Sequence, residues 1–230
     1  MNNEYEIVDI SMPLTADYKM HTPVGVQDVQ LGIQVIKDYD APGGAGQVVR
    51  GITARLHHGT HVDAPEHFIR NGPQINDLSL STFIGPAVVA DVRHVGPGKP
   101  ITAEDLENAL PAAYQKGDRL LIRTDWNENY GRPDYVEGSP YLTMAATDWC
   151  VTNGFPIVGM DFAHTKDDPA SPYRFFITRR FCESQVVTTM GYVRNLAAVT
   201  NPRVLVIALP LALHGAEASP VRAVVLDGAL

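Results

Sequence analysis

The sequence has few of the residues that mark several common classes of protein. Only two of its 230 residues are cysteines, Cys150 and Cys182, and they lie far apart without CxxC spacing. Neither a disulfide framework nor a cysteine-based zinc site is therefore indicated. Lys and Arg number 18 against 26 for Asp and Glu, and the cations form no stripe that could follow a phosphate backbone. We expect no nucleic-acid partner.

Long apolar runs and nucleotide-binding fingerprints are also missing. No run approaches the roughly 18 apolar residues of a membrane span. The first four residues, MNNE, lack the basic start of a signal peptide, so we expect no membrane partner and a cytoplasmic location. Neither GxGxxG after a predicted strand nor GxxxxGK[ST] occurs. With 45% hydrophobic and 19% charged residues, the composition is typical of a globular protein, and we expect one domain over 1–230.

Apolar periodicity predicts strands that alternate with short helices. Strands are expected at 7–14, 27–36, 47–56, 86–95, 118–124, 156–161, 203–209 and 221–226. Thr102 and Asp105 have the spacing of a capping box, which opens a helix that stops at Pro111. A second helix is expected over 143–153, with Gly154 as its C-terminal stop. Residues 39–46 form a Pro/Gly-rich loop, and 175–198 stays open between helix and mixed structure.

The densest group of potential ligands lies in residues 56–68, which read LHHGTHVDAPEHF and contain four of the eight histidines. Four of these polar residues have odd numbers, so an extended backbone with period two directs them to one face. They are His57, His61, Asp63 and His67. A helix would also bring His57 and His61 together, as in HExxH metalloproteases. Gly59 and Pro65 oppose that helix.

A single ion can be shared only if this strand bends. In an extended strand His61 and Asp63 lie about 7 Å apart at Cα, whereas His57 is about 13 Å from His61. Gly59 can adopt the backbone angles that bring the His57 imidazole back to the other two. Two imidazoles and a carboxylate, with positions left for water, are typical of a catalytic site. We expect one divalent ion, zinc in preference to manganese.

His67 is the predicted proton-transfer group. A bound dication acidifies its water and polarises a carbonyl, which favours hydrolysis of an acyl bond. His67 follows Asp63 by four residues, past the Ala64-Pro65 turn, and a free imidazole has a pKa of about 6.5, which suits this role. His58 has the opposite parity, so we expect it to support the site from behind or to lie on the surface.

The segment HHGTHVDAPEHF resembles the HxGTHxDxPxHF signature of the metal-dependent cyclase and hydrolase family, which includes bacterial kynurenine formamidases and isatin hydrolases. The resemblance extends to residues 10–13, 140–162 and 208–224. It implies an α/β fold of the swivelling β/β/α type, with a central barrel-like sheet and flanking helices. It also implies metal ligands at His57, His61 and Asp63, and a homodimer or homotetramer.

The chain departs from the formamidase branch at the second metal position. That branch holds a second ion with the shared aspartate, a later His and a Glu twelve residues beyond it. Counting back from the RNL segment at 194–196, those positions are Cys182 and Arg194 here. We therefore expect one ion per chain. The isatin hydrolase-like branch manages with one metal, and Gln185 is a candidate for an extra oxygen ligand.

Three residues are candidate substrate contacts. His164 stands where the family's GxDxxS segment has Ser, after the GMD of 159–161. Trp126 and Phe83 are candidates for an aromatic wall that would suit a flat substrate, although either residue type is more often part of a core.

Three functions fit these residues. The first is hydrolysis of a small amide, cyclic amide (lactam) or lactone by metal-activated water. The second is a biosynthetic cyclase or dehydratase that uses the same metal to polarise a carbonyl. The third is a catalytically silent metal-binding scaffold, suggested by Cys182 and Arg194. His67 counts against the third, because a purely structural site needs no proton carrier.

Overall fold

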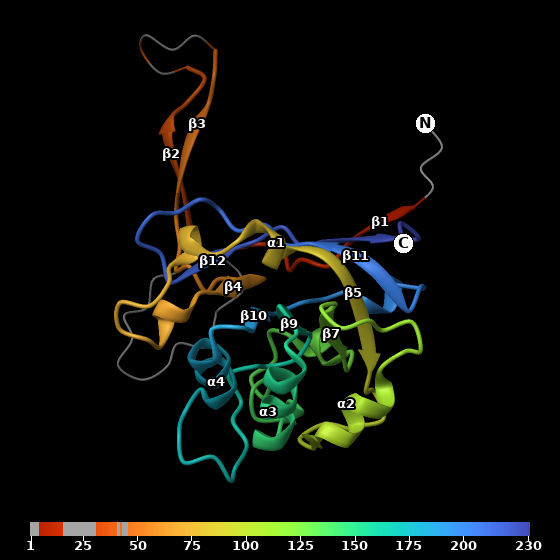
Figure 1. Cartoon of the computed structure of the whole chain (residues 1–230). Helices are drawn as coiled ribbons and strands as arrows, with labels where there is room; N and C mark the ends of the chain where they lie inside the picture. The colour runs from red at the N-terminus through yellow and green to blue at the C-terminus, as the bar shows by residue number, and fades with distance from the viewer. Residues whose placement is uncertain (1–4, 16–30, 41, 43–45) are drawn as a thin grey trace.

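A curled nine-stranded sheet forms the body of the protein (Figure 1). The structure is a computed structural model that describes residues 5–15, 31–40, 42 and 46–230. Its strands are β1 (Glu6–Asp9), β2 (Gly32–Lys37), β3 (Val49–Thr53), β4 (His61–Asp63), β5 (Ile84–Asp91), β6 (Pro100–Ile101), β7 (Arg119–Arg123), β8 (Tyr141–Leu142), β9 (Ile157–Met160), β10 (Thr188–Gly191), β11 (Arg203–Ile207), β12 (Ala218–Pro220) and β13 (Val224–Asp227). Its α-helices are α1 (Leu80–Phe83), α2 (Ala103–Ala109), α3 (Met144–Asn153) and α4 (Phe176–Ser184).

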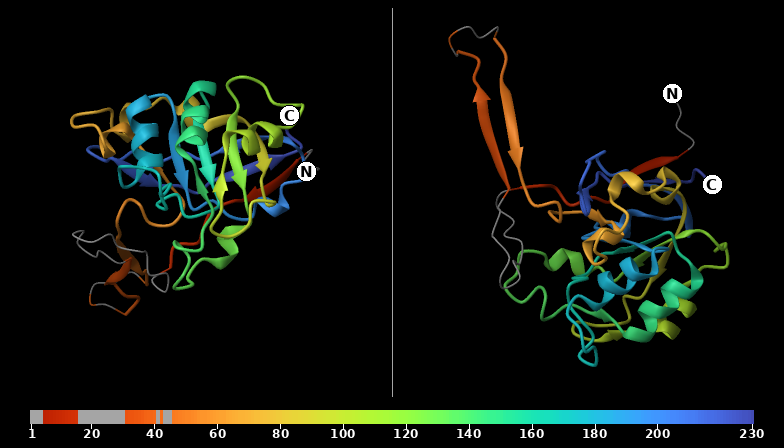
Figure 2. Two further views of the ribbon diagram at one scale, coloured as in Figure 1. Left: turned by 90° about the horizontal axis from the view of Figure 1, so that it is seen from below. Right: turned by 60° about the vertical axis from the view of Figure 1, so that its left-hand side comes forward.

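The sheet mixes parallel and antiparallel pairs. Its order is β1-β13-β11-β5-β7-β9-β10-β4-β12, with β5, β7, β9 and β10 parallel. Helices α2, α3 and α4 lie side by side against one face (Figure 2). The predicted α/β class, with a barrel-like sheet and flanking helices, is confirmed. Among the described residues, no helix is long and apolar enough to cross a membrane.

Side chains of the central strands alternate between two cores. In β7, Leu120 and Ile122 face the helices, and Leu121 faces the inside of the curl. The inner core contains Val62 of β4 and Phe83 at the end of α1, both without exposed surface. Alternation of this kind is what a strand covered on both faces requires. Strand β4 therefore lies in a buried part of the sheet.

The predicted elements are found with shorter bounds. The capping box of α2 forms, with Thr102 and Asp105 bonded to each other's backbone N–H. Helix α3 ends at Gly154, which has φ +69°. The segment 175–198 resolves into α4, β10 and a short 3₁₀ turn, Leu196–Ala198. Residues 27–30 of one expected strand, and 41 and 43–45 of the expected loop, lie outside the described residues.

Candidate metal centre

Strand β4 lies between two neighbours that come from distant parts of the chain. His61 pairs with Gly191 of β10 on one side and with Pro220 of β12 on the other. His61 and Asp63 therefore share one face of the strand, while Val62 points into the inner core. This arrangement fixes two of the three predicted ligands on a strand held from both sides.

The chain bends before β4, as the sequence predicted. Gly59 has φ +63°, and a Cβ at this position would lie 2.6 Å from Leu14 Cδ2, so a larger residue would be strained and would clash. Thr60 Oγ1 accepts a hydrogen bond from Met12 N and donates one to Tyr192 O, each at 2.7 Å. These contacts fasten the bend to two other loops and return His57 to the face of β4.

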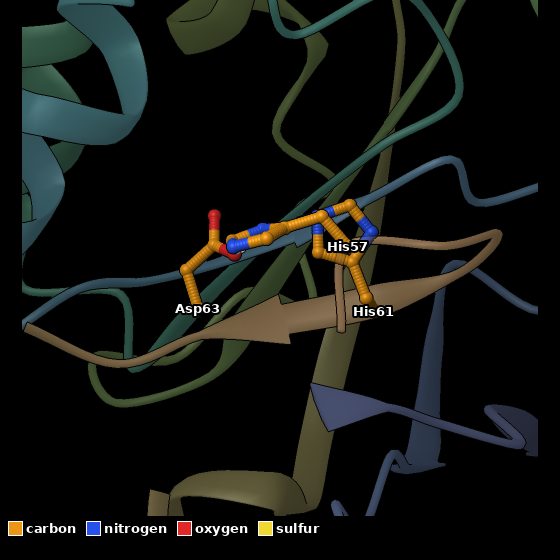
Figure 3. Close-up of side chains that lie close together, drawn as sticks. All are labelled: His57, His61 and Asp63. Atoms are coloured by element: carbon orange, nitrogen blue, oxygen red, sulfur yellow. Dashed lines mark ion pairs between the residues drawn. The ribbon is translucent and has the colours of Figure 1, made fainter. Parts of the chain in front are cut away.

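The three side chains converge on one point (Figure 3). His57 Nδ1 lies 2.9 Å from Asp63 Oδ1, and His61 Nε2 lies 3.5 Å from the same oxygen. Both atoms are buried; Asp63 Oδ1 faces the two imidazole nitrogens, and His61 Nε2 has no hydrogen-bond partner among the described residues. Leaving buried polar atoms without partners costs about 1–3 kcal/mol each. Ligands of one tetrahedral zinc ion lie about 3.4 Å apart, so this donor set fits a divalent ion.

Two further contacts orient the imidazoles. His61 Nδ1 lies 2.8 Å from Gly59 O, which makes Nδ1 the protonated nitrogen and leaves Nε2 free to ligate. His57 Nε2 lies 3.2 Å from Glu217 Oε1, on the opposite side of the ring from Asp63. A carboxylate behind a ligating histidine fixes its orientation and raises its basicity. Glu217 therefore belongs to the site, although it was not among the residues predicted from the sequence.

The electrostatics of the metal-free site reflect this convergence. Burial would raise the pKa of Asp63, but the neighbouring charges of His57 and His61 hold it below its usual range. Burial would likewise lower the pKa of His57, yet Asp63 and Glu217 raise it to about 9. Burial lowers the pKa of His61 to about 4. In the metal-free site, the protonated His57 therefore lies between the carboxylates of Asp63 and Glu217. A divalent ion would compete with the His57 proton for this position.

His67 lies beside the first ligand. It ends the 3₁₀ turn Pro65–His67, which begins directly after β4, and its backbone N–H donates to Ala64 O. Its ring centroid is 4.3 Å from that of His57. His67, His57 and Glu217 form a second group of potential ligand atoms within 4.8 Å of one another. The turn therefore brings His67 to the cluster, as expected for a proton carrier.

His164 reaches the site from the loop after β9. Its buried ring lies 5.5 Å from that of His61 and 5.0 Å from that of Tyr192. A Cβ on Gly191 would come within 2.4 Å of this ring, so glycine is needed on the strand next to His61. Burial, aided by the charge of His61, lowers the pKa of His164 to about 3, which keeps the ring neutral.

Two predicted site residues lie elsewhere and are corrected. Gln185 caps the C-terminal end of α4 in a left-handed conformation and is exposed, whereas Asp63 is buried. Phe83 has no exposed surface and packs in the inner core, because the apolar face of β5 and α1 needs a large side chain there. A fully buried ring cannot form the wall of an open pocket.

Trp126 is separated from the cluster by other aromatic residues. Its indole Nε1 donates to Tyr135 O at 2.9 Å, and its ring stacks on that of Tyr135. Tyr135 in turn stacks on Tyr192, which packs against His61. Two tyrosines thus connect Trp126 to the site, and it lines a separate cavity of about 460 Å³.

The two positions of the second metal differ in burial: Cys182 is buried, and Arg194 is exposed. Cys182 projects from α4, and its Sγ lies 3.5 Å from Ala64 O. Burial, with the nearby charge of Asp63, raises the pKa of this thiol well above its usual value. Arg194 is exposed and lines a groove on the body. Among the described residues, the candidate ligand groups at this site contain neither.

His58 is buried. Burial together with the charge of Arg55 lowers its pKa, against a backbone hydrogen bond with Thr15 that raises it, and its Nδ1 has no hydrogen-bond partner among the described residues. It is not among the potential ligand groups of the described residues.

Comparison with known proteins gives the family. Residues 8–166 match the model of the Cyclase family, described as "Putative cyclase". The kynurenine formamidase of Bacillus cereus is 30% identical over 222 residues, covering 96% of this chain and 97% of that protein. The kynurenine formamidase of Bacillus anthracis is 29% identical over 220 residues, covering 95% and 96%.

Solved structures share the fold. Isatin hydrolase A from Labrenzia aggregata, bound to benzyl benzoate, superposes with a TM-score of 0.84 at 22% identity, covering 98% of this chain and 94% of that one. Isatin hydrolase A from Ralstonia solanacearum gives 0.80 at 25% identity, covering 97% and 92%. The chain belongs to the cyclase family, as the histidine motif predicted. It is a hydrolase of that family, with a site suited to a divalent metal.

Proposed function

We propose that this chain cleaves a small amide, cyclic amide (lactam) or lactone bond with one divalent ion held by His57, His61 and Asp63. The observation that carries the proposal is the convergence of their donor atoms, including the buried His61 Nε2, which has no hydrogen-bond partner among the described residues. Zinc suits the imidazole-rich donor set, and manganese is the alternative. The relatives named kynurenine formamidase and isatin hydrolase support an amide or lactam substrate.

The ion would supply Lewis-acid polarisation of the substrate carbonyl and acidification of water. The other tasks belong to the chain. His67 takes the proton of the attacking water and returns it to the leaving nitrogen or oxygen, which requires a neutral imidazole at the start. Burial lowers the pKa of His67, and this favours the neutral form at pH 7. Glu217 holds the His57 ring so that its Nδ1 faces Asp63.

A metal-replete activity screen tests this function. The purified protein is assayed against aryl formamides, isatin-like lactams and lactones, and its metal is measured by elemental analysis. We expect hydrolysis of at least one class and about one equivalent of metal per chain. Two equivalents at full occupancy would overturn the single-metal assignment. Ring closure or loss of water from an open-chain substrate, with no hydrolysis, would favour a cyclase or dehydratase instead.

A further inference from the structure

His67 and Glu217 form, with His57, a second group of potential ligands that is more exposed than the first. The ligand atoms of the three residues lie within 4.8 Å of one another. The side chain of Glu217 is 37% exposed and that of His57 is 26% exposed, whereas His61 and Asp63 are buried. The two groups therefore share His57 but differ in their access to solvent.

The backbone holds His67 and Glu217 in a fixed relation to each other. Ala64 N donates to Glu217 O at 2.8 Å, and His67 N donates to Ala64 O at 3.0 Å. Glu217 directly precedes β12, and His67 ends the 3₁₀ turn that follows β4. Both residues are thus tied to Ala64, so the pairing of β12 with β4 brings the two side chains together.

Ligand atoms of this second group remain free when the first site is filled. An ion in the first site would take His57 Nδ1, so the ring proton lies on Nε2 and is donated to Glu217 Oε1, 3.2 Å away. Among the described residues, Glu217 Oε2 and the ring nitrogens of His67 have no hydrogen-bond partner. A carboxylate oxygen and a neutral imidazole nitrogen are both good zinc ligands. They can fill two positions of a tetrahedral ion, and water can fill the others.

We propose that His67 and Glu217 bind a second zinc ion, more weakly than the first ion is bound, and that this second ion inhibits the enzyme. It would have two protein ligands instead of three and would lie near the charge of the first ion, and both factors lower its affinity. The formamidase branch holds its second ion with the shared aspartate and at the positions of Cys182 and Arg194. The two sites therefore differ.

The inhibition rests on the proposed function, because it depends on His67 as the proton carrier. A neutral imidazole has one nitrogen lone pair, and His67 uses it to accept the proton of the attacking water. Zinc bound to that nitrogen takes the lone pair, while the first ion keeps its three ligands. At saturation, turnover should fall roughly a hundredfold or more, which is the effect of losing a positioned base. A mild chelator that removes only the weaker ion should restore it.

Calorimetric titration with zinc chloride tests the binding site without any substrate. The starting sample is wild-type protein with one equivalent of zinc per chain, dialysed against metal-free buffer to remove loosely held ions. We expect it to bind one further equivalent, at least tenfold more weakly than the first. His67→Ala should keep the first equivalent and lose the second. Glu217→Gln, loaded with its first equivalent, should bind the second at least tenfold more weakly than the wild type, because an amide oxygen carries no charge.

His214→Ala is the control for capture of zinc by a surface histidine. His214 is exposed on the loop before β12, close to Glu217 in the sequence. This variant should bind the second equivalent as the wild type does. Failure of the wild type to bind a further equivalent, an unchanged second equivalent in His67→Ala, or its loss in His214→Ala would each overturn the proposed site.

The activity assay distinguishes failure of this proposal from failure of the proposed function. If the second equivalent binds but excess zinc leaves turnover unchanged, the inhibition is overturned and the hydrolytic function stands. If no substrate is hydrolysed, the proposed function fails, and the calorimetric titration still decides whether His67 and Glu217 bind zinc. Inhibition that a mild chelator reverses in both the wild type and His214→Ala would support the whole proposal.

Discussion

Strands β3 and β4 are neighbours in the sequence but have opposite surroundings. Strand β4 is buried at all three of its residues, between β10 and β12. Strand β3 pairs with β2 alone and exposes Ile52 on one face and Val49 at its start. Buried polar atoms on β4 and exposed apolar side chains on β3 are both unfavourable when no other group binds or covers them. The comparison separates the two kinds of surface: the buried donors that suit an ion lie on β4, and the exposed apolar side chains lie on β3.

Removing a ligand breaks the β4 side of this comparison and has the largest expected effect. His61→Ala and Asp63→Ala should lose both the metal and the activity, because either change leaves only two of the three protein ligands. Elemental analysis after dialysis and a turnover assay measure the two losses. A variant that keeps metal at wild-type affinity would exclude its residue from the ligand set.

The second prediction separates the proton carrier from the ligands. His67→Ala should keep the metal but lower turnover by roughly two to four orders of magnitude, the usual range for losing a positioned acid-base group. Metal content and turnover are measured on the same sample. Near wild-type turnover would point to His164 or His58 as the proton carrier, whereas loss of metal would make His67 a ligand.

The third prediction concerns Glu217, which acts on the site through His57. Glu217→Gln keeps the shape of the side chain but removes the charge behind the imidazole, so metal affinity should fall about tenfold to a hundredfold. Competition with a chromophoric chelator measures the change. Glu183→Gln is a matched control, since Glu183 is exposed on α4 and pairs with Arg179. Equal affinities for the two variants would reduce Glu217 to a surface carboxylate.

The sequence predicted most of the ligand geometry because that geometry is local. Period-two spacing placed His61 and Asp63 on one face, and Gly59 marked the bend that returns His57. Glu217 was not predicted, because it reaches His57 only through the pairing of β12 with β4. Its one local signal was its position directly before the closing segment ASPVRAV at 218–224.

The wrong predictions also arise because a local sequence pattern does not contain contacts between distant parts of the chain. Gln185 was a candidate for an extra oxygen ligand, but helix α4 ends there and the residue is exposed. Aromatic residue type cannot distinguish a pocket wall from a core, and Phe83 lies in the core. In β2 and β3, alternation predicted strands but did not show that their apolar side chains lie exposed. Burial depends on sheet order, which a local pattern does not contain.

The smallest expected effect compares one apolar residue from each strand. Val62→Ala should lower the free energy of unfolding by about 2 kcal/mol, because it leaves a cavity in the fully buried inner core. Ile52→Ala should change it by less than about 0.5 kcal/mol, because Ile52 is exposed and substitutions at exposed positions usually have small effects. Urea unfolding of the two variants and the wild type measures both effects. If Ile52→Ala costs as much as Val62→Ala, the Ile52 side chain is packed in the folded protein, and the contrast between the two strands fails.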